Sequence, residues 1–138
     1  MDQKSTFGLE VYASNQIFYQ GRSTLIDLPS TDGGHTFLAH HENVIIALVP
    51  GTTRIVKEDG TEIRVVTGSG FAEMINNRVK MFVHSAERPE DIDINRAIEA
   101  REKAKEQLRQ QNSLAEYHRS KMELARAMSR LKETGKYN

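Results

Sequence analysis

The chain changes composition abruptly at residues 87–97, and this junction limits what it can fold into more than any other feature. Eight of its nine glycines and seven of its nine aromatic residues lie before residue 86. The part after the junction is rich in alanine and in charged residues, which favour helices. A β-structured domain over residues 1–86, followed by a helical segment over residues 87–138, is therefore predicted.

The first part shows short runs of β-branched, aromatic and alternating apolar residues. These runs cover residues 7–12, 23–28, 44–49, 52–56, 62–67, 71–75 and 79–83. Turn-forming residues separate them, and Asp59-Gly60 and Asn76-Asn77 are the clearest hairpin turns, since Asn and Gly tolerate positive φ. Strands of this length, with a turn signal about every ten residues, predict an antiparallel β-sandwich or barrel.

The second part shows the apolar periodicity and the capping residues that are typical of two helices. Asp91 or Asp93 is placed to cap a first helix that runs to about Gln111. Residues 113–116, Ser-Leu-Ala-Glu, form a capping box that starts a second helix, and Gly135 ends that helix. Because the connection between them is so short, the two helices are expected to form an antiparallel hairpin.

The apolar surface between these two helices is small. The second helix offers an interrupted seam at three-and-four spacing: Leu114, Tyr117, Lys121, Leu124, Met128 and Leu131. The first helix offers Ile94, Ala97, Ile98, Ala104 and Leu108. Alanine contacts bury little apolar area, and short helices are marginal in water, so we expect a weakly held hairpin that can unpack or dock again.

Composition excludes several classes of function. The 138 residues carry no formal net charge, so the chain has no general attraction for nucleic acid or lipid. Cysteine is absent, which excludes disulfides, thiolate metal sites and a cysteine nucleophile. No transmembrane segment and no N-terminal apolar signal region are found, which favours the bacterial cytoplasm. The glycine loops and nucleophile or zinc motifs of common enzymes are also missing, so no catalytic activity is expected.

Three histidines, His35, His40 and His41, lie close to Asp32 and Glu42 and raise the question of a metal site. Neighbouring residues of a strand point to opposite faces, so His40 and His41 would not readily share one ion. Surface histidines are the simpler interpretation, and no metal site is predicted.

Arginines in the helical part suggest an anion site. Arg126 and Arg130 are four residues apart, on one face of the second helix. In an antiparallel hairpin the end of this helix lies beside the start of the first, which brings both arginines near Asp93 and Arg96. Guanidinium groups at a helix N-terminus can bind phosphates, so one interpretation is a phosphate site. The alternative is a solvent-exposed helix face with intrahelical ion pairs, which would give the same spacing.

Five segments carry recognisable motifs. They are residues 28–41, Ala47-Leu-Val-Pro-Gly51, Gly68-Ser-Gly-Phe-Ala-Glu73, Ile92-Asp-Ile-Asn-Arg-Ala97 and Arg126-Ala-Met-Ser-Arg-Leu131. In this order, and over nearly the whole chain, they resemble the epsilon subunit of bacterial F-type ATP synthase. Ser30, Ala39 and His40 stand where that family usually has glycine, proline and glycine, so this loop is expected to take another shape.

The resemblance implies a sandwich that grips the gamma subunit and rests on the ring of c subunits, as part of the rotating central stalk. It implies a non-catalytic, peripheral subunit at the cytoplasmic face of the bacterial membrane, which couples proton or sodium flow to ATP synthesis. The family's hairpin acts as a brake: folded, it permits turnover, and extended along gamma into the alpha/beta catalytic head, it blocks ATP hydrolysis. A weakly held hairpin suits such a two-state element.

In some bacterial members of the family the folded hairpin binds ATP as a regulatory ligand, and no other cofactor is required. The residues that match this site are Glu87, Ile92, Asp93, Arg96, Ala97, Arg126 and Arg130, and Lys103 stands at an eighth position that departs from the family. The resemblance places Asp93 and Ala97 near adenine, Glu87 near adenine or ribose, and the arginines at the phosphates. Lys103 replaces a family arginine with a point charge, which lowers the expected affinity. A free-standing ATP sensor and a scaffold protein without a rotor role are the alternatives.

Overall fold

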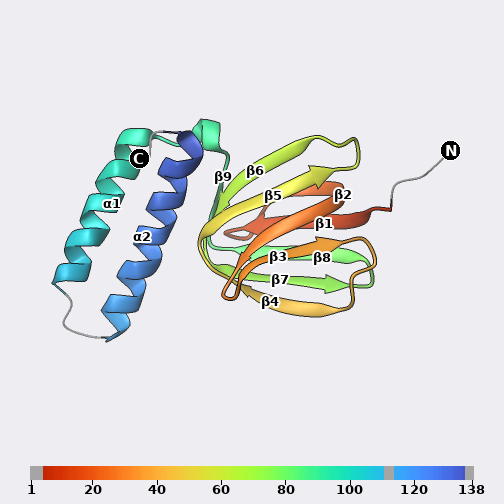
Figure 1. Cartoon of the computed structure of the whole chain (residues 1–138), viewed down its shortest axis with the longest axis horizontal. Helices are drawn as coiled ribbons and strands as arrows, with labels where there is room; N and C mark the ends of the chain where they lie inside the picture. The colour runs from red at the N-terminus through yellow and green to blue at the C-terminus, as the bar shows by residue number, and fades with distance from the viewer. Residues whose placement is uncertain (1–4, 111–113, 136–138) are drawn as a thin grey trace.

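The computed structural model describes residues 5–110 and 114–135. Within them the strands come first: β1 (Phe7–Ala13), β2 (Gln16–Ser30), β3 (Gly33–Leu38), β4 (Val44–Leu48), β5 (Gly51–Lys57), β6 (Glu62–Thr67), β7 (Gly70–Ile75), β8 (Arg78–Val83) and β9 (Ala86–Glu87). A short 3-10 helix, η1 (Pro89–Asp91), leads to α1 (Ile94–Arg109) and α2 (Leu114–Thr134). The strands form a sandwich, and the two helices lie side by side at one end of it (Figure 1). The predicted fold class is confirmed.

The strands form one continuous sheet that folds over into two layers. Their order is β1-β8-β7-β4-β2-β5-β6-β9, and β3 pairs with β2 beside this path. The long strand β2 joins the two layers, since its first half pairs with β1 and its second half with β3 and β5. Strand β4 pairs with β7 along its whole length but meets β2 only where Leu48 faces Ser30, so the rest of that edge has no strand partner among the described residues. The pairing of β1 with β8 is parallel, unlike the antiparallel arrangement predicted.

The core lies between the two layers, and strands β1 to β8 all contribute to it. Phe7, Ile26, Phe37 and Ile55 have no exposed surface. All seven runs predicted as strands are strands in the structure. The sequence interpretation misses β3, because Gly33-Gly-His-Thr36 shows no apolar alternation and resembles a turn.

Residues with positive φ mark the turns between strands. Asn76 and Asn77 have φ of 51° and 62°, and Gly60 has φ of 89°, as their residue types predict. His40 has φ of 64°, and its N–H donates to Oδ1 of Asn77 at 2.7 Å. The backbone at His40 thus takes the left-handed conformation that favours glycine, although no glycine stands there, and the expected change of loop shape stays a prediction.

The two helices form an antiparallel hairpin. Oδ1 of Asp93 accepts a hydrogen bond from the Arg96 N–H at 3.2 Å and caps α1, as predicted. Helix α1 ends at Arg109, two residues before the expected Gln111. Gly135 follows α2 with φ of 74°, which confirms the predicted end. The expected capping box begins at Ser113, which lies outside the described residues.

Small side chains fill the seam between the helices. The buried residues are Ala97, Ala104, Ser120, Ala127 and Leu131. Ile98 and Lys121 are exposed, so their assignment to the seam is wrong. Tyr117 is 40% exposed but lies on the side of α2 that carries Leu124 and Leu131. Ile98 is turned by about 100° from Ala97, the residue that faces α2. The alanine-rich seam is confirmed, and its easy unpacking stays a prediction.

Helix α2, rather than α1, lies against the sandwich (Figure 1). Thr52 of β5 donates a hydrogen bond to Glu133 of α2 at 2.9 Å, and Arg64 of β6 lies 3.9 Å from the same carboxylate. The sheet itself extends one residue past the expected domain boundary at 86, since Glu87 of β9 pairs with Val66. The last turns of α2 are therefore attached to the sheet.

Asp27 of β2 makes the sandwich sensitive to acid. Burial raises its pKa, but hydrogen bonds from Thr36 and Arg54, together with the Arg54 charge, outweigh burial and hold the pKa below its usual value. The Arg54 Nε lies 2.8 Å from Oδ2 of Asp27. A lowered folded-state pKa stabilises the fold above about pH 4, and this contribution is lost as the pH falls through the folded-state pKa.

We expect Asp27→Asn to lower the free energy of unfolding at neutral pH by about 1 kcal/mol, because the ion pair is partly exposed. The mutant should also lose less stability than the wild type as the pH falls from about 5 to about 2, measured by urea unfolding. Asp32→Asn, at an exposed turn, is the control. Parallel pH profiles for Asp27→Asn and the wild type would contradict the prediction.

Candidate functional site

Six of the eight residues predicted to bind ATP line one pocket where the hairpin meets the sheet. This base pocket has a volume of about 370 Å³, which is within the range of small-molecule sites. It is lined by Glu87, Asp91, Ile92, Asp93, Arg96, Ala97, Ala100 and Arg130. Strand β9, η1, the connection to α1, the first turns of α1 and helix α2 all contribute. Residues distant in sequence meet here because the hairpin is antiparallel.

Arg130 and Glu87 make a two-pronged ion pair in the base pocket. Nε of Arg130 donates to Oε2 of Glu87 at 2.9 Å, and Nη2 donates to the other carboxylate oxygen. Their side chains are 23% and 29% exposed. Parallel bonds between a guanidinium and a carboxylate fix the orientation of both groups. The pair therefore joins the end of α2 to the last strand of the sheet.

The other charged groups of the base pocket are less constrained. Glu87, Asp91 and Asp93 are acidic, whereas Arg96 and Arg130 are basic. Asp93 already accepts one hydrogen bond as the cap of α1. The exposed Arg96 guanidinium has no ion-pair partner among the described residues. An anion entering this pocket would meet one uncommitted arginine and one that already holds a carboxylate.

The structure does not bring Arg126 or Lys103 into the base pocket. Arg126, one turn before Arg130, lines a second cavity of about 500 Å³ between α2 and the sandwich, which we call the wedge. The wedge is lined by Pro50, Gly68, Ser69, His84, Arg119, Met122, Glu123 and Arg126. Lys103 is exposed on α1, two helical turns, or about 10 Å, beyond Arg96. Arg126 thus lies beside the base pocket, and Lys103 lies away from it.

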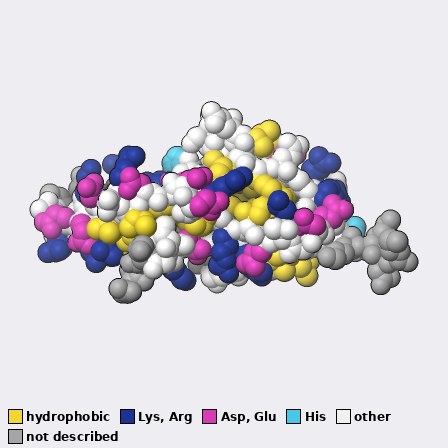
Figure 2. Space-filling model, turned by 90° about the horizontal axis from the view of Figure 1, so that it is seen from above, with side chains coloured by type: hydrophobic (Ala, Val, Ile, Leu, Met, Phe, Trp, Pro, Cys, Tyr) yellow, Lys and Arg dark blue, Asp and Glu magenta, His cyan; other side chains and the backbone are white. Residues whose placement is uncertain are grey.

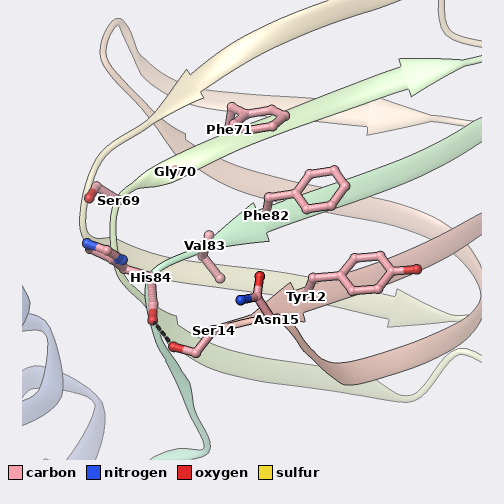
Figure 3. A pocket seen from close by; sticks show the side chains of 9 residues that line it. All are labelled: Tyr12, Ser14, Asn15, Ser69, Gly70, Phe71, Phe82, Val83 and His84. Atoms are coloured by element: carbon pink, nitrogen blue, oxygen red, sulfur yellow. Dashed lines mark hydrogen bonds between the residues drawn. The ribbon is translucent and has the colours of Figure 1, made fainter.

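A row of apolar side chains crosses the outer face of one layer of the sandwich. The strand register places Ala47, Phe71, Phe82, Tyr12 and Ile17 side by side in that order. The Phe82 ring stacks on Phe71, with centroids 5.0 Å apart, and on Tyr12, at 5.1 Å. Figure 3 shows these three rings following one another across neighbouring strands. We call the five residues the aromatic row.

The aromatic row is open to solvent. Phe71 is 45% exposed and Ile17 is 55% exposed, while Ile45, next to the row on β4, is 65% exposed. A shallow cleft of about 780 Å³ runs along the row. The neighbouring row on the same face is polar and contains Glu73 and Lys80 as a facing pair. An exposed apolar stripe bounded by charged residues is typical of a protein interface.

Tyr12 links the aromatic row to the polar row beside it. Its hydroxyl donates to Glu10, and this hydrogen bond, followed by burial and the Glu10 charge, raises the tyrosine pKa. The phenol therefore stays neutral at physiological pH, and the aromatic row presents an uncharged surface.

Sequence reasoning missed the aromatic row. The alternation within residues 71–75 and 79–83 predicts the strands, but it does not show which face is covered. The available signal was that both faces of these strands carry large apolar residues: Met74 and Met81 point into the core, and Phe71 and Phe82 point outward. A strand with one face in water usually has polar residues there.

Two of the three histidines pack against the core. The rings of His35 and His41 lie 5.7 Å apart, and both contact the buried Phe37 edge-on. Residues 39–43 form a loop rather than a strand, so strand alternation is not what separates His40 from His41. No group of three or more metal-ligating side chains is found in the part of the chain that the structure describes.

Acidic and basic side chains are interspersed over the hairpin and the adjoining face of the sandwich (Figure 2). A mixed surface of this kind lacks the single-sign field that attracts nucleic acid. Within residues 5–110 and 114–135, no helix has the length and apolar character needed to cross a bilayer.

Two family models match consecutive parts of the chain. The model described as "ATP synthase, Delta/Epsilon chain, beta-sandwich domain" matches residues 6–89. The model described as "ATP synthase, Delta/Epsilon chain, long alpha-helix domain" matches residues 90–134. The division between the two models falls within η1.

Similar proteins from bacteria span almost the same length. One from Ruminiclostridium cellulolyticum, named ATP synthase epsilon chain, is 39% identical over 132 residues, which are 96% of this chain and 98% of the relative. Another of the same name, from Caldanaerobacter subterraneus subsp. tengcongensis, is 36% identical over 132 residues, or 96% of each chain.

Solved structures of mitochondrial ATP synthases contain chains of the same fold. One chain in the cryo-EM structure of the Euglena gracilis enzyme, titled OSCP/F1/c-ring, gives a TM-score of 0.78 at 21% identity, over 94% of this chain and 81% of that one. A chain in the Tetrahymena thermophila structure, titled central stalk/c-ring, gives 0.69 at 13% identity, over 96% and 99%. At these identities the likeness concerns the fold alone.

Proposed function

This chain belongs to the delta/epsilon family of ATP synthase, as an epsilon chain and a non-catalytic stalk subunit, and from that premise we propose how its two parts act. The sandwich holds the gamma subunit and rests on the ring of c subunits, at the cytoplasmic face of the bacterial membrane. The hairpin binds ATP when docked and inhibits ATP hydrolysis when extended into the alpha/beta head. Because the chain belongs to this family, the two alternatives, a free-standing ATP sensor and a scaffold protein without a rotor role, are rejected.

The aromatic row supports the role of the sandwich in binding gamma. Phe71 and Ile17 are exposed and Tyr12 and Phe82 are half-buried, although the row forms a continuous apolar stripe over five strands, and no described element of this chain covers it. Covering such a stripe gains about 25 cal/mol for each Å² removed from water. A stalk subunit must stay attached to its neighbours during rotation, and a rigid sheet face suits that task better than loops.

One observation carries the ATP proposal: the docked hairpin gathers six predicted residues around a single pocket. Ile92, which is half-buried beside the buried Ala97, offers apolar surface to the adenine ring. The second carboxylate oxygen of Asp93, which does not cap α1, is able to accept a hydrogen bond from the adenine amine. Arg96 and Arg130 are placed to donate to phosphate oxygens.

The phosphates require cations beyond those of the base pocket. Three carboxylates face two guanidinium groups there, so the pocket alone does not favour a triphosphate. Arg126 lies one turn from Arg130 and is the nearest further cation on the same side of α2. We therefore assign Arg126 to the end of the phosphate chain, with Lys103 too far along α1 for direct contact in this conformation.

We expect ATP to bind saturably to the isolated chain in isothermal titration calorimetry, without and then with Mg²⁺. Arg96→Ala should weaken binding by roughly tenfold or more, because it removes a charge-assisted contact and breaks no ion pair of the free protein. Arg126→Ala should weaken binding as well if the phosphates extend along α2.

Arg109→Ala is the matched control, since this exposed arginine lies at the far end of α1. It should bind ATP like the wild type. If the folded wild-type chain gave no saturable heat at millimolar ATP, the ATP proposal would be wrong and the base pocket would be an element of the architecture.

The hairpin is also proposed to inhibit ATP hydrolysis by the assembled enzyme. Glu133→Ala removes the contacts with Thr52 and Arg64 that attach α2 to the sheet, so it should favour the extended hairpin. At low ATP we expect hydrolysis to fall by roughly fivefold relative to wild type. Truncation after Glu87 should abolish inhibition, and an enzyme that remains inhibited after this truncation would contradict the proposal.

A further inference from the structure

We propose that the aromatic row and the wedge form one interaction surface, and that the subunit covering the row also pairs its carboxylates with Arg119 and Arg126 of α2. This inference rests on the proposed docking of gamma on the row. It adds a second contact, made by the docked hairpin. The partner would thereby bind the docked and the extended hairpin with different affinities.

The two clefts are continuous. Ser69 and His84 line both the cleft along the aromatic row and the wedge. This corner is well fixed, since Ser14 Oγ donates to the His84 carbonyl at 2.8 Å and the His84 N–H donates to the Ser69 carbonyl at 2.9 Å. Figure 3 shows Ser69 and His84 at the end of the row, with α2 beyond them. A partner lying on the row reaches α2 by passing over this corner.

The wedge end of the surface lacks counter-charges. Arg119 and Arg126 are seven residues apart and so lie on the same side of α2. Neither has an ion-pair partner among the described residues, and Glu123, on the same lining, is not within ion-pair distance of them. Arg130 on the same side, in contrast, holds Glu87. Two uncommitted guanidinium groups favour carboxylates supplied by another chain.

Met122 gives this end of the surface an apolar component. It lies between the two arginines and is 40% exposed. The surface therefore runs from stacked aromatic rings, over a fixed polar corner, to an apolar residue flanked by cations. The partner segment that fits it is apolar over the sheet and acidic where it meets α2.

Such a partner couples its own binding to docking of the hairpin. Contacts with Arg119 and Arg126 in the wedge exist only while α2 lies against the sandwich. These contacts raise the affinity of the partner for the docked form by some factor. By thermodynamic linkage, the bound partner raises the equilibrium constant for hairpin docking by the same factor. The catalytic head must then overcome this factor before the hairpin extends.

The test is the affinity of the gamma subunit for the full chain in nucleotide-free buffer. Arg119→Ala combined with Arg126→Ala should weaken binding by roughly tenfold or more, with a larger effect at low salt. Lys121→Ala, an exposed cation on the opposite side of α2, is the matched control and should bind like wild type. Equal affinities for the double mutant and the wild type would overturn the inference.

A second readout follows the hairpin itself. The chain has no cysteine, so Glu58→Cys in the β5–β6 turn and Glu102→Cys on α1 allow two dyes to be attached. Adding gamma should increase the population with the dye separation of the docked hairpin, and the Arg119 and Arg126 double mutant should lose this response. A decrease of that population on adding gamma would also overturn the inference. If mutants of the aromatic row bound gamma with unchanged affinity, the proposed docking of gamma on the row would instead be wrong.

Discussion

Replacing Phe71 and Phe82 with serine is expected to weaken binding of the gamma subunit by roughly a hundredfold or more, while the sandwich stays folded. The two rings stack on each other at the centre of the aromatic row, and aromatic residues in that position carry most of the energy of an interface. Their loss from a fully covered site costs about 2 kcal/mol or more each, and 1.4 kcal/mol corresponds to a factor of ten in affinity.

The fold should tolerate these substitutions because the rings contribute little to the core. Phe71 is 45% exposed in the free chain, and the core is formed by the opposite face of β7 and β8, where Ala72 and Met81 are fully buried. Leu38→Ser is the matched control, since Leu38 is 52% exposed on β3 in the other layer of the sandwich. Binding should be measured by surface plasmon resonance alongside thermal unfolding. If Leu38→Ser bound gamma as weakly as the Phe71 and Phe82 mutant does, the loss of affinity would not be specific to the aromatic row.

The positions of the strands and helices could be predicted from the sequence because they depend on local signals. Asn76-Asn77 adopts the positive φ values that its residue types allow, Asp93 caps α1, and Gly135 ends α2. Strand β3 could not be predicted, because Gly33 and Gly34 have no side chain to show which face is buried. Its pairing with β2 is a long-range contact that supplies what local propensity lacks.

The candidate site was predictable in part for the same reason. The antiparallel hairpin and the motif spacing together place Asp93, Arg96 and Arg130 around one pocket. The separation of Arg126 from that pocket depends on the exact approach of α2 to the sheet, which spacing along a helix does not determine. The ion pair between Arg130 and Glu87 was also unforeseen, although both residues were predicted site members.

Gly70→Ala is expected to destabilise the sandwich strongly. A Cβ at Gly70 would lie 1.9 Å from the carbonyl oxygen of Phe82 and 2.9 Å from Cα of Val83. These atoms belong to the backbone of the paired strand β8, so no side-chain rotation relieves the overlap. The strands must separate, and we expect a loss of about 3 kcal/mol or more in the free energy of unfolding.

A loss of that size lowers the melting temperature of a domain this small by roughly 10 °C or more. Gly34→Ala is the matched control, because no heavy atom lies within 4 Å of a Cβ there and the substitution reduces the entropy of the unfolded chain. It should keep or slightly raise the melting temperature in differential scanning calorimetry. A Gly70→Ala protein with the melting temperature of the wild type would show that β7 and β8 do not approach each other this closely at Gly70.

The open edge of β4 has a consequence for how the cell must make this protein. Five consecutive apolar residues, Val44 to Leu48, form a strand with no charge, proline or bulge, and Ile45 on it is 65% exposed. Edge strands of this kind template pairing with other chains. Surplus copies made without their partners would associate with one another, so balanced synthesis of the stalk subunits protects the chain from self-association.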